Sequence, residues 1–136
     1  MAKRVLVVDD HPPTLALIRT ILEAEKTEQF EVFEAATGTE CLKVADQKGP
    51  FDLILLDVSL PDPDMDGFEV CRALRRVDKK VPIVFVTAKG DLKDYAKGRE
   101  VGGDSYVVKP IARAALRSIV SLFTSIERSQ RPRFGA

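Results

Sequence analysis

The sequence has no tryptophan, two methionines, two cysteines and a single histidine among its 136 residues. One histidine, His11, cannot build a histidine-rich metal cluster. Cys41 and Cys71 lie in helical patterns without the CxxC spacing of a zinc or redox site. We therefore expect two reduced core thiols, as is usual for a cytosolic protein, and neither a disulfide nor a metal site.

The sequence also lacks a long apolar run and an excess of either charge. No apolar stretch approaches the roughly 18 residues that cross a membrane, and no signal peptide precedes the first apolar segment. The 21 basic and 21 acidic residues give a net charge of zero, which argues against a nucleic-acid-binding surface over the whole chain. We expect a cytoplasmic protein that contacts no membrane and makes no direct contact with nucleic acid.

Five short segments are typical of β-strands, and most of them are continuous apolar runs. A run without alternation indicates a strand that is covered on both faces, as in a parallel sheet. The segment that starts at Phe30 alternates weakly, which suits a strand near an edge. The predicted strands are residues 4–8, 30–35, 52–56, 81–86 and 105–108.

Each predicted strand is followed by apolar residues at helical spacing. The predicted helices are residues 12–26, 37–47, 68–76, 91–101 and 111–128. This strict alternation predicts one α/β domain, in which a doubly wound five-stranded parallel sheet carries helices on both faces. We expect the domain to span residues 1–128. The polar segment 129–136 is predicted to be a flexible tail that is too short for a DNA-binding or catalytic unit.

Four of the predicted strands end at polar residues. Asp9 and Asp10 follow the first strand, Asp57 the third, Thr87 the fourth and Lys109 the fifth. Because the carboxyl ends of parallel strands meet at one edge of the sheet, we expect these side chains to form one site. Three carboxylates repel one another and favour a bound divalent cation, and oxygen ligands suit Mg²⁺ best.

This set of side chains is sufficient for phosphoryl transfer, which depends mainly on positioning and charge compensation. Asp57 would be the nucleophile and would become an aspartyl phosphate. Lys109 would neutralise one phosphate oxygen, and Thr87 would donate a hydrogen bond to another.

The motifs around these residues resemble those of the receiver domain of two-component response regulators, over residues 3–128. The motifs are Val7-Val8-Asp9-Asp10, Asp57 followed by Pro61 and by Met65-Asp66-Gly67, Thr87-Ala88, and Gly103-Asp104-Ser105-Tyr106-Val107-Val108-Lys109-Pro110. The resemblance implies a flavodoxin-like fold, as in chemotaxis regulators, with the strand order 2-1-3-4-5. It also implies a signalling switch that catalyses its own phosphotransfer and dephosphorylation, and not an enzyme in the usual sense.

The resemblance further implies the partner and the metal ligands. A sensor histidine kinase, or a phosphotransfer protein, would donate the phosphoryl group of a phosphohistidine to Asp57 in a reaction that requires Mg²⁺, or Mn²⁺ in its place. Asp10, Asp57 and the backbone carbonyl of Ser59 would bind the metal directly. Asp9 would contribute through a water molecule.

The resemblance assigns Lys109 to the phosphate, Thr87 to a switch hydroxyl and Tyr106 to an aromatic side chain that moves inward with it. It implies a cis peptide bond between Lys109 and Pro110. The fourth predicted helix, the fifth strand and the last helix would form the surface that changes and contacts a partner. Ser59 and Lys89 occupy positions that tune the lifetime of the phosphate.

One loop departs from the family pattern. The family usually places its proline four residues and its glycine eight residues after the phosphoacceptor. Here Pro61 keeps the first interval from Asp57, whereas Gly67 stands ten residues away. The two extra residues, around Pro63 and Asp64, are either a tolerated surface insertion or a change in partner choice.

The predicted last helix carries two apolar stripes, whereas an amphipathic surface helix needs only one. The first stripe consists of Ile111, Ala115, Ile119, Leu122 and Ile126. The second consists of Ala112, Leu116, Val120 and Phe123. We predict that the second stripe contacts a partner, either a second copy of the chain or a downstream domain; the alternative is one broad core stripe.

Two other classes of protein share parts of this pattern. A phosphatase of the haloacid dehalogenase type would place a general-acid aspartate two residues after the nucleophile, where this chain has Ser59, and its acidic pair would come last. A flavodoxin-like cofactor binder would need a Gly-rich phosphate loop after the first strand, where this chain has His11-Pro12-Pro13.

Overall fold

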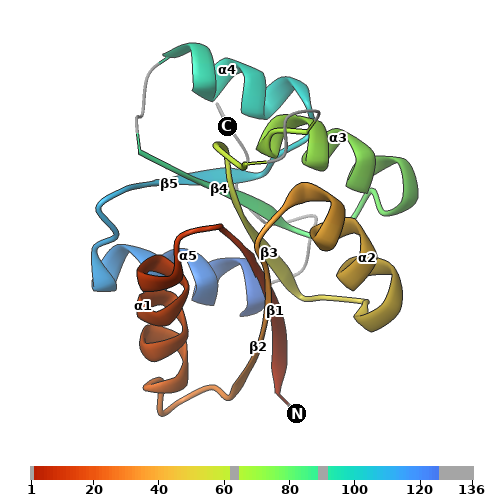
Figure 1. Cartoon of the computed structure of the whole chain (residues 1–136). Helices are drawn as coiled ribbons and strands as arrows, with labels where there is room; N and C mark the ends of the chain where they lie inside the picture. Colours follow the sequence, from red (N-terminus) through yellow and green to blue (C-terminus); the bar gives the residue numbers. More distant parts are fainter. Residues whose placement is uncertain (1, 62–64, 89–91, 126–136) are drawn as a thin grey trace.

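A computed structural model describes residues 2–61, 65–88 and 92–125, in which strands and helices alternate (Figure 1). The strands are β1 (Lys3–Val8), β2 (Phe30–Ala35), β3 (Leu53–Asp57), β4 (Ile83–Thr87) and β5 (Ser105–Val108). The helices are α1 (Pro12–Glu23), α2 (Gly38–Lys48), α3 (Gly67–Val77), α4 (Leu92–Glu100) and α5 (Arg113–Ser125). The predicted alternation of elements is confirmed. None of the helices among these residues is long and apolar enough to cross a membrane.

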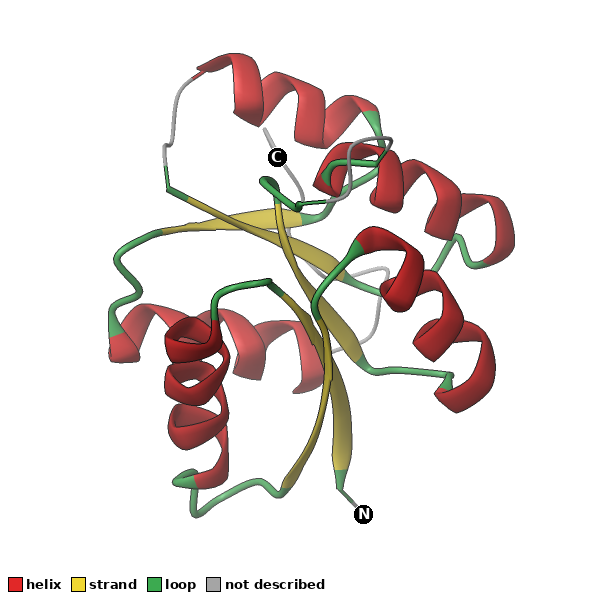
Figure 2. Cartoon of the chain, in the orientation of Figure 1, coloured by secondary structure: helices red, strands yellow, loops and turns green. Residues whose placement is uncertain are grey.

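The strands form one parallel sheet in the order β2-β1-β3-β4-β5, with β2 at an edge as predicted. The register places Val8 beside Leu56 and Asp57 beside Val86. Figure 2 shows the twisted sheet between its helices. Helices α1 and α5 cover one face, and α2, α3 and α4 cover the other (Figure 1). The predicted fold class and strand order are therefore confirmed.

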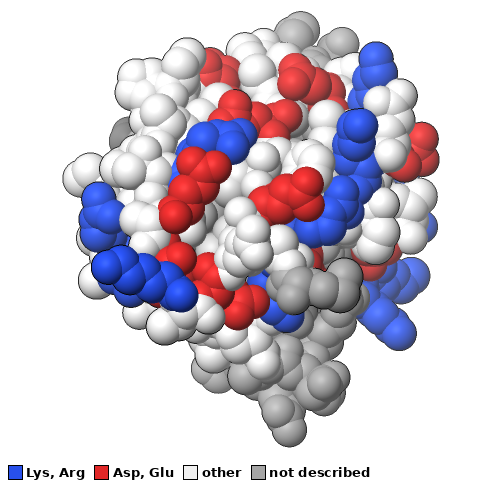
Figure 3. Space-filling view, turned by 90° about the horizontal axis from the view of Figure 1, so that it is seen from below, with Lys and Arg blue, Asp and Glu red and all other residues white. Residues whose placement is uncertain are grey.

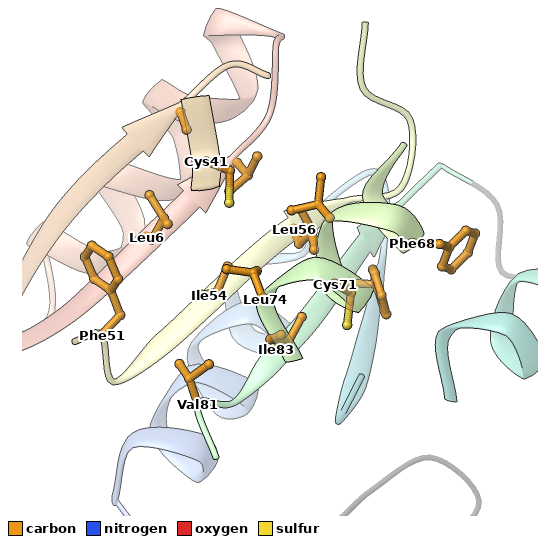
Figure 4. Close-up of a cluster of buried hydrophobic side chains, with 14 of the residues drawn as sticks. Leu6, Cys41, Phe51, Ile54, Leu56, Phe68, Cys71, Leu74, Val81 and Ile83 are labelled. Atoms are coloured by element: carbon orange, nitrogen blue, oxygen red, sulfur yellow. The ribbon is translucent and has the colours of Figure 1, made fainter. Parts of the chain in front are cut away.

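The core consists of two apolar clusters, one on each face of the sheet. Alternate residues of a strand point to opposite faces, so Leu6 of β1 belongs to the cluster under α2 and α3, and Val7 to the cluster under α1 and α5. Cys41 and Cys71 lie in the first cluster (Figure 4). Both are buried and unpaired, and burial raises the pKa of each thiol to about 12. The prediction of core thiols is confirmed.

Several predicted boundaries differ from the observed ones by one residue or more, and two of these differences have local reasons. Strand β4 begins at Ile83 and not at residue 81, because Pro82 has no N–H group to donate to the ladder. Helix α1 ends at Glu23, before the predicted residue 26. The carboxylate of Glu25 accepts the N–H groups of Lys26 and Thr27 at 3.1 and 3.4 Å, which turns the chain out of the helix.

The prediction that the second stripe of α5 contacts a partner is wrong. Leu116 and Phe123 are 0% exposed and Val120 is 1% exposed, and all three pack with α1 and the sheet. Leu122 of the first stripe is 36% exposed. The helix lies on the sheet through its second stripe, and the sequence could not tell the two stripes apart because both are apolar.

A partly buried ion pair joins α3 to the loops before β4 and β5. The Arg75 guanidinium donates to the Asp104 carboxylate at 2.9 Å, to the Gly102 carbonyl at 2.9 Å and to the Val81 carbonyl at 2.6 Å. Asp104 also accepts the N–H of Ile83 at 2.9 Å. Because every partner is hydrogen-bonded, the pair avoids the cost of burying an unpaired charge.

Gly67 lies against the backbone that carries Asp57. Its N–H donates to the Val58 carbonyl at 2.8 Å. A Cβ atom at this position would overlap the Asp57 carbonyl oxygen. Gly67→Ala must therefore shift the start of α3 or the end of β3. We expect the free energy of unfolding in urea to fall by about 1–3 kcal/mol, as for other overpacked positions.

Gly38→Ala is the matched control for this prediction. A Cβ atom at Gly38 would meet side-chain atoms of Val70 and Met65 and not backbone, and side chains can move more readily. A loss of stability for Gly67→Ala no greater than that for Gly38→Ala would contradict the prediction.

Candidate functional site

The polar residues predicted to act together lie at the carboxyl edge of the sheet. Asp9 and Asp10 directly follow β1, Asp57 is the last residue of β3, Thr87 is the last residue of β4, and Lys109 directly follows β5. Because the strands are parallel and neighbours in register, residues from four distant segments meet here.

The ammonium group of Lys109 lies between two carboxylates. Its Nζ atom is 2.9 Å from Oδ2 of Asp9 and 3.1 Å from Oδ2 of Asp57. Asp9 and Asp57 are 2% and 5% exposed. Burial of this kind requires charged groups to have partners, and Lys109 serves both. Lys109 was predicted to pair with a phosphate, and its pairing with Asp9 was not predicted.

Backbone N–H groups hold the second oxygen of each carboxylate. The N–H of Ser59 donates to Oδ1 of Asp57 at 3.0 Å, and the N–H of His11 donates to Oδ1 of Asp9 at 2.8 Å. Aspartate commonly accepts the N–H of the residue two positions later, so the spacing in the sequence could have indicated both bonds. Each carboxylate is fixed at both oxygens.

The three aspartates at this edge have the arrangement of a cation site. Asp9, Asp10 and Asp57 each offer a carboxylate oxygen, and these atoms lie within 4.8 Å of one another. Asp10 is exposed, whereas the other two are buried. An all-oxygen donor set that is open to water on one side fits Mg²⁺, which keeps several water ligands.

The charges of the site shift two pKa values. Burial raises the pKa of the Asp57 carboxyl above its ordinary value of 3.8, and the charge of Asp9 raises it further, against the opposing effects of the Ser59 N–H and Lys109. Burial lowers the pKa of Lys109, but the hydrogen bonds and charges of Asp9 and Asp57 outweigh it and the net change is upward. The single positive charge of Lys109 thus faces two carboxylates, Asp9 and Asp57, and can neutralise only one negative charge.

The other predicted residues are placed as follows. Thr87 is 4% exposed, and its carbonyl accepts the N–H of Lys109 at 2.6 Å. Tyr106 is half-buried in β5, and the centroid of its ring lies 5.0 Å from the ring centroid of Tyr95 in α4. The peptide bond before Pro110 is cis, as the resemblance implied.

Three further predictions concern residues outside the described part of the chain. They are the predictions for Lys89, for the insertion around Pro63 and Asp64, and for the segment 129–136.

The raised pKa of Asp57 leads to a test of stability. Its ionised form is less favourable in the folded than in the unfolded chain, so Asp57 lowers stability increasingly as pH rises above 3.8. Asp57→Asn removes this charge. Without divalent cations, we expect the free energy of unfolding of Asp57→Asn to exceed that of the natural chain at pH 7, and the difference to vanish below about pH 4.

Asp46→Asn, which changes an exposed carboxylate of α2, is the control and should leave stability unchanged. Urea unfolding at several pH values provides the measurement. If Asp57→Asn were less stable than the natural chain at pH 7, the ion pair with Lys109 would outweigh the effects of burial and of Asp9.

Comparisons with known proteins agree with this geometry. A family model described as the response regulator receiver domain matches residues 5–121. The chain is 46% identical over 112 residues to the transcriptional regulatory protein AfsQ1 of Streptomyces coelicolor, a match that covers 82% of this chain and 46% of that protein. It is 41% identical over 112 residues to the alkaline phosphatase synthesis transcriptional regulatory protein PhoP of Bacillus subtilis, a match that covers 82% of this chain and 44% of that protein. The chain spans about half the length of these curated relatives.

Solved structures give the same result. The chemotaxis response regulator CheY4 of Vibrio cholerae is 32% identical with a TM-score of 0.80, over 89% of this chain and 98% of that one. A putative response regulator from Chloroflexus aurantiacus is 29% identical with a TM-score of 0.83, over 93% of this chain and 100% of that one. These matches favour the receiver interpretation over the phosphatase and the cofactor binder. The chain belongs to the family of response regulator receiver domains, the signalling modules of two-component systems.

Proposed function

We propose that Asp57 accepts a phosphoryl group from a sensor histidine kinase or a phosphotransfer protein. One observation carries the proposal: the ammonium of Lys109 bridges Asp9 and Asp57, which form a cluster of three carboxylates together with Asp10. This arrangement supplies a nucleophile, a positive charge and a cation site within one small region, which are the requirements of phosphoryl transfer.

The reaction forms a bond between a carboxylate oxygen of Asp57 and phosphorus, and breaks the bond between phosphorus and the imidazole nitrogen of the donor histidine. Lys109 would leave the carboxylate and pair with a phosphate oxygen, while Thr87 would donate its hydroxyl to another. Mg²⁺, or Mn²⁺, supplies further positive charge at the transferred group when bound. Its ligands would be Asp10, Asp57 and the Ser59 carbonyl, with Asp9 acting through water.

Removal of the phosphate is the second half of the proposed cycle. We assign to the chain its own dephosphorylation as well as its own phosphotransfer, so that it is a switch and not an enzyme acting on separate substrates. Ser59 and Lys89 would set the lifetime of the phosphate. The N–H of Ser59 already contacts Asp57 at 3.0 Å, which supports a role for this position.

The response to phosphorylation would be a population shift. When Thr87 turns toward the phosphate, Tyr106 would move inward and change the surface of α4, β5 and α5. Large side chains are partly exposed on these elements: Tyr95 is 39%, Val108 47% and Leu122 36% exposed. These side chains support a partner there, either a second copy or a downstream domain.

The relatives indicate the setting in which the switch would work. AfsQ1 and PhoP are named transcriptional regulators, and a relative from Mycolicibacterium smegmatis is named the DNA-binding response regulator MtrA. We propose that residues 1–128 form a cytoplasmic receiver domain that contacts proteins and makes no direct contact with nucleic acid.

Phosphorylation can be tested with a small phosphodonor such as acetyl phosphate in the presence of Mg²⁺. We expect the intact mass to increase by one phosphoryl group, because Asp57 is the proposed nucleophile and Lys109 and the acidic cluster lie beside it. Asp57→Asn should gain nothing, and Asp46→Asn should behave like the natural chain. Phosphorylation of Asp57→Asn to the same extent as the natural chain would exclude Asp57 as the acceptor.

Metal binding can be tested separately by thermal unfolding. A ligand that binds only the folded state stabilises it by about 2.7 kcal/mol at 100 times its dissociation constant. We expect Mg²⁺ to raise the Tm of the natural chain by several degrees and EDTA to reverse the rise. Asp10→Asn should lose most of this effect, since Asp10 is a predicted ligand. An equal Mg²⁺ effect in Asp10→Asn and the natural chain would contradict the assignment of this ligand.

A further inference from the structure

A recess in the surface lies at the edge of the sheet opposite to Asp57. It is a hollow of about 440 Å³ between α2 and α3, at the end where β3 begins. Its floor is apolar and includes Phe51, Ile54, Leu74 and Val81, which gather in one part of the core cluster (Figure 4). The candidate phosphorylation site contributes no residue to it.

The sequence explains why this space is not filled. The two helices line the hollow with the small residues Ala45 and Ala73, and Gly49 follows the end of α2. A leucine at either alanine would take up part of the volume. The side chain of Val77, at the end of α3, is 85% exposed beside the hollow. An apolar side chain this exposed gains from being covered, at roughly 25 cal/mol for each Å² of apolar surface removed from water.

The chain segments that line the hollow carry more exposed cations than carboxylates, although the chain is neutral overall. Exposed cations adjoin the lining residues along the chain: Lys48, Arg76, Lys79 and Lys80. Two carboxylates line the hollow, and one of them, Asp78, is engaged with the N–H groups of Lys80 and Val81 at 2.8 and 2.9 Å. Figure 3, seen from below, shows Lys and Arg side chains on the side where Figure 1 places α2 and α3.

We propose that this hollow is a docking site for an acidic segment of a partner protein, which inserts one large apolar side chain. The excess of exposed cations on the lining segments selects an acidic segment, because complementary charges steer association and favour the correct partner. The hollow is open to solvent on one side, and sites for free small molecules usually enclose most of the ligand. An apolar anchor that belongs to a larger partner suits it better, since the partner also covers Val77.

The position of the hollow adds a second property. It lies at the amino ends of the strands, whereas Asp57 and Lys109 lie at the carboxyl ends. Docking should therefore depend little on the phosphorylation state of Asp57, so this surface can hold a partner in both states of the proposed switch.

Selection from a phage-displayed library of random short peptides tests the proposal. The natural chain is the target, and the variant Ala73→Leu, in which the hollow is narrowed, is used for counter-selection. We expect the enriched peptides to carry several Asp or Glu residues around one large apolar residue. Their affinity should fall about tenfold or more in Ala73→Leu, as for other interface anchors, and several-fold in Val77→Ser.

Two further variants separate specific docking from general attraction. Lys79→Glu combined with Lys80→Glu should weaken binding by about tenfold, whereas Lys26→Glu combined with Arg113→Glu, which changes exposed cations outside this hollow, should not. Asp57→Asn should bind as tightly as the natural chain. Val77→Ser changes an exposed side chain and keeps the test valid if Ala73→Leu fails to fold.

Three results would overturn the proposal. The first is that no peptide distinguishes the natural chain from Ala73→Leu and Val77→Ser. The second is that the enriched peptides are not acidic. The third is that both pairs of charge reversals weaken binding equally. None of these results bears on phosphorylation of Asp57, so this proposal and the proposed function can fail independently.

Discussion

The ionic contact between Lys109 and two buried carboxylates is the interaction around which the carboxyl edge of the sheet is organised. Ionised groups at 2% and 5% exposure, such as Asp9 and Asp57, are tolerated only with close partners. The parallel register supplies those partners by bringing the ends of β1, β3 and β5 together. Because one ammonium balances fewer charges than the three aspartates carry, the edge retains an attraction for a further cation.

The two edges of the sheet differ in chemical character, one because of the loops that follow the strands and the other because of the helices that cover the sheet. At the carboxyl edge, backbone N–H groups from the loops after β1 and β3 fix the carboxylates. At the amino edge, small residues on α2 and α3 leave an apolar hollow, and the segments that line it carry an excess of exposed cations. A single α/β layer arrangement can therefore present one surface suited to phosphate chemistry and another suited to protein contact.

Most of the fold and the residues of the site could be predicted from the sequence, because they depend on local patterns. Apolar runs identify the strands, and a polar residue after such a run marks the edge of a parallel sheet, as with Asp57. Pairings between distant residues were missed. Neither Asp9 with Lys109 nor Arg75 with Asp104 leaves a local signal. The buried stripe of α5 was also missed, because sheet twist and neighbouring side chains decide which apolar face turns inward.

The bond between Lys109 and Asp9 spans 100 positions of the chain. During synthesis, the segment that carries Asp9 leaves the ribosome long before the one that carries Lys109. Until the last strand has been made and has docked on β4, the aspartates have no ammonium beside them. A chain that ends before Lys109 thus lacks the ion pairs of the carboxyl edge, and the proposed phosphorylation of Asp57 would require the finished domain.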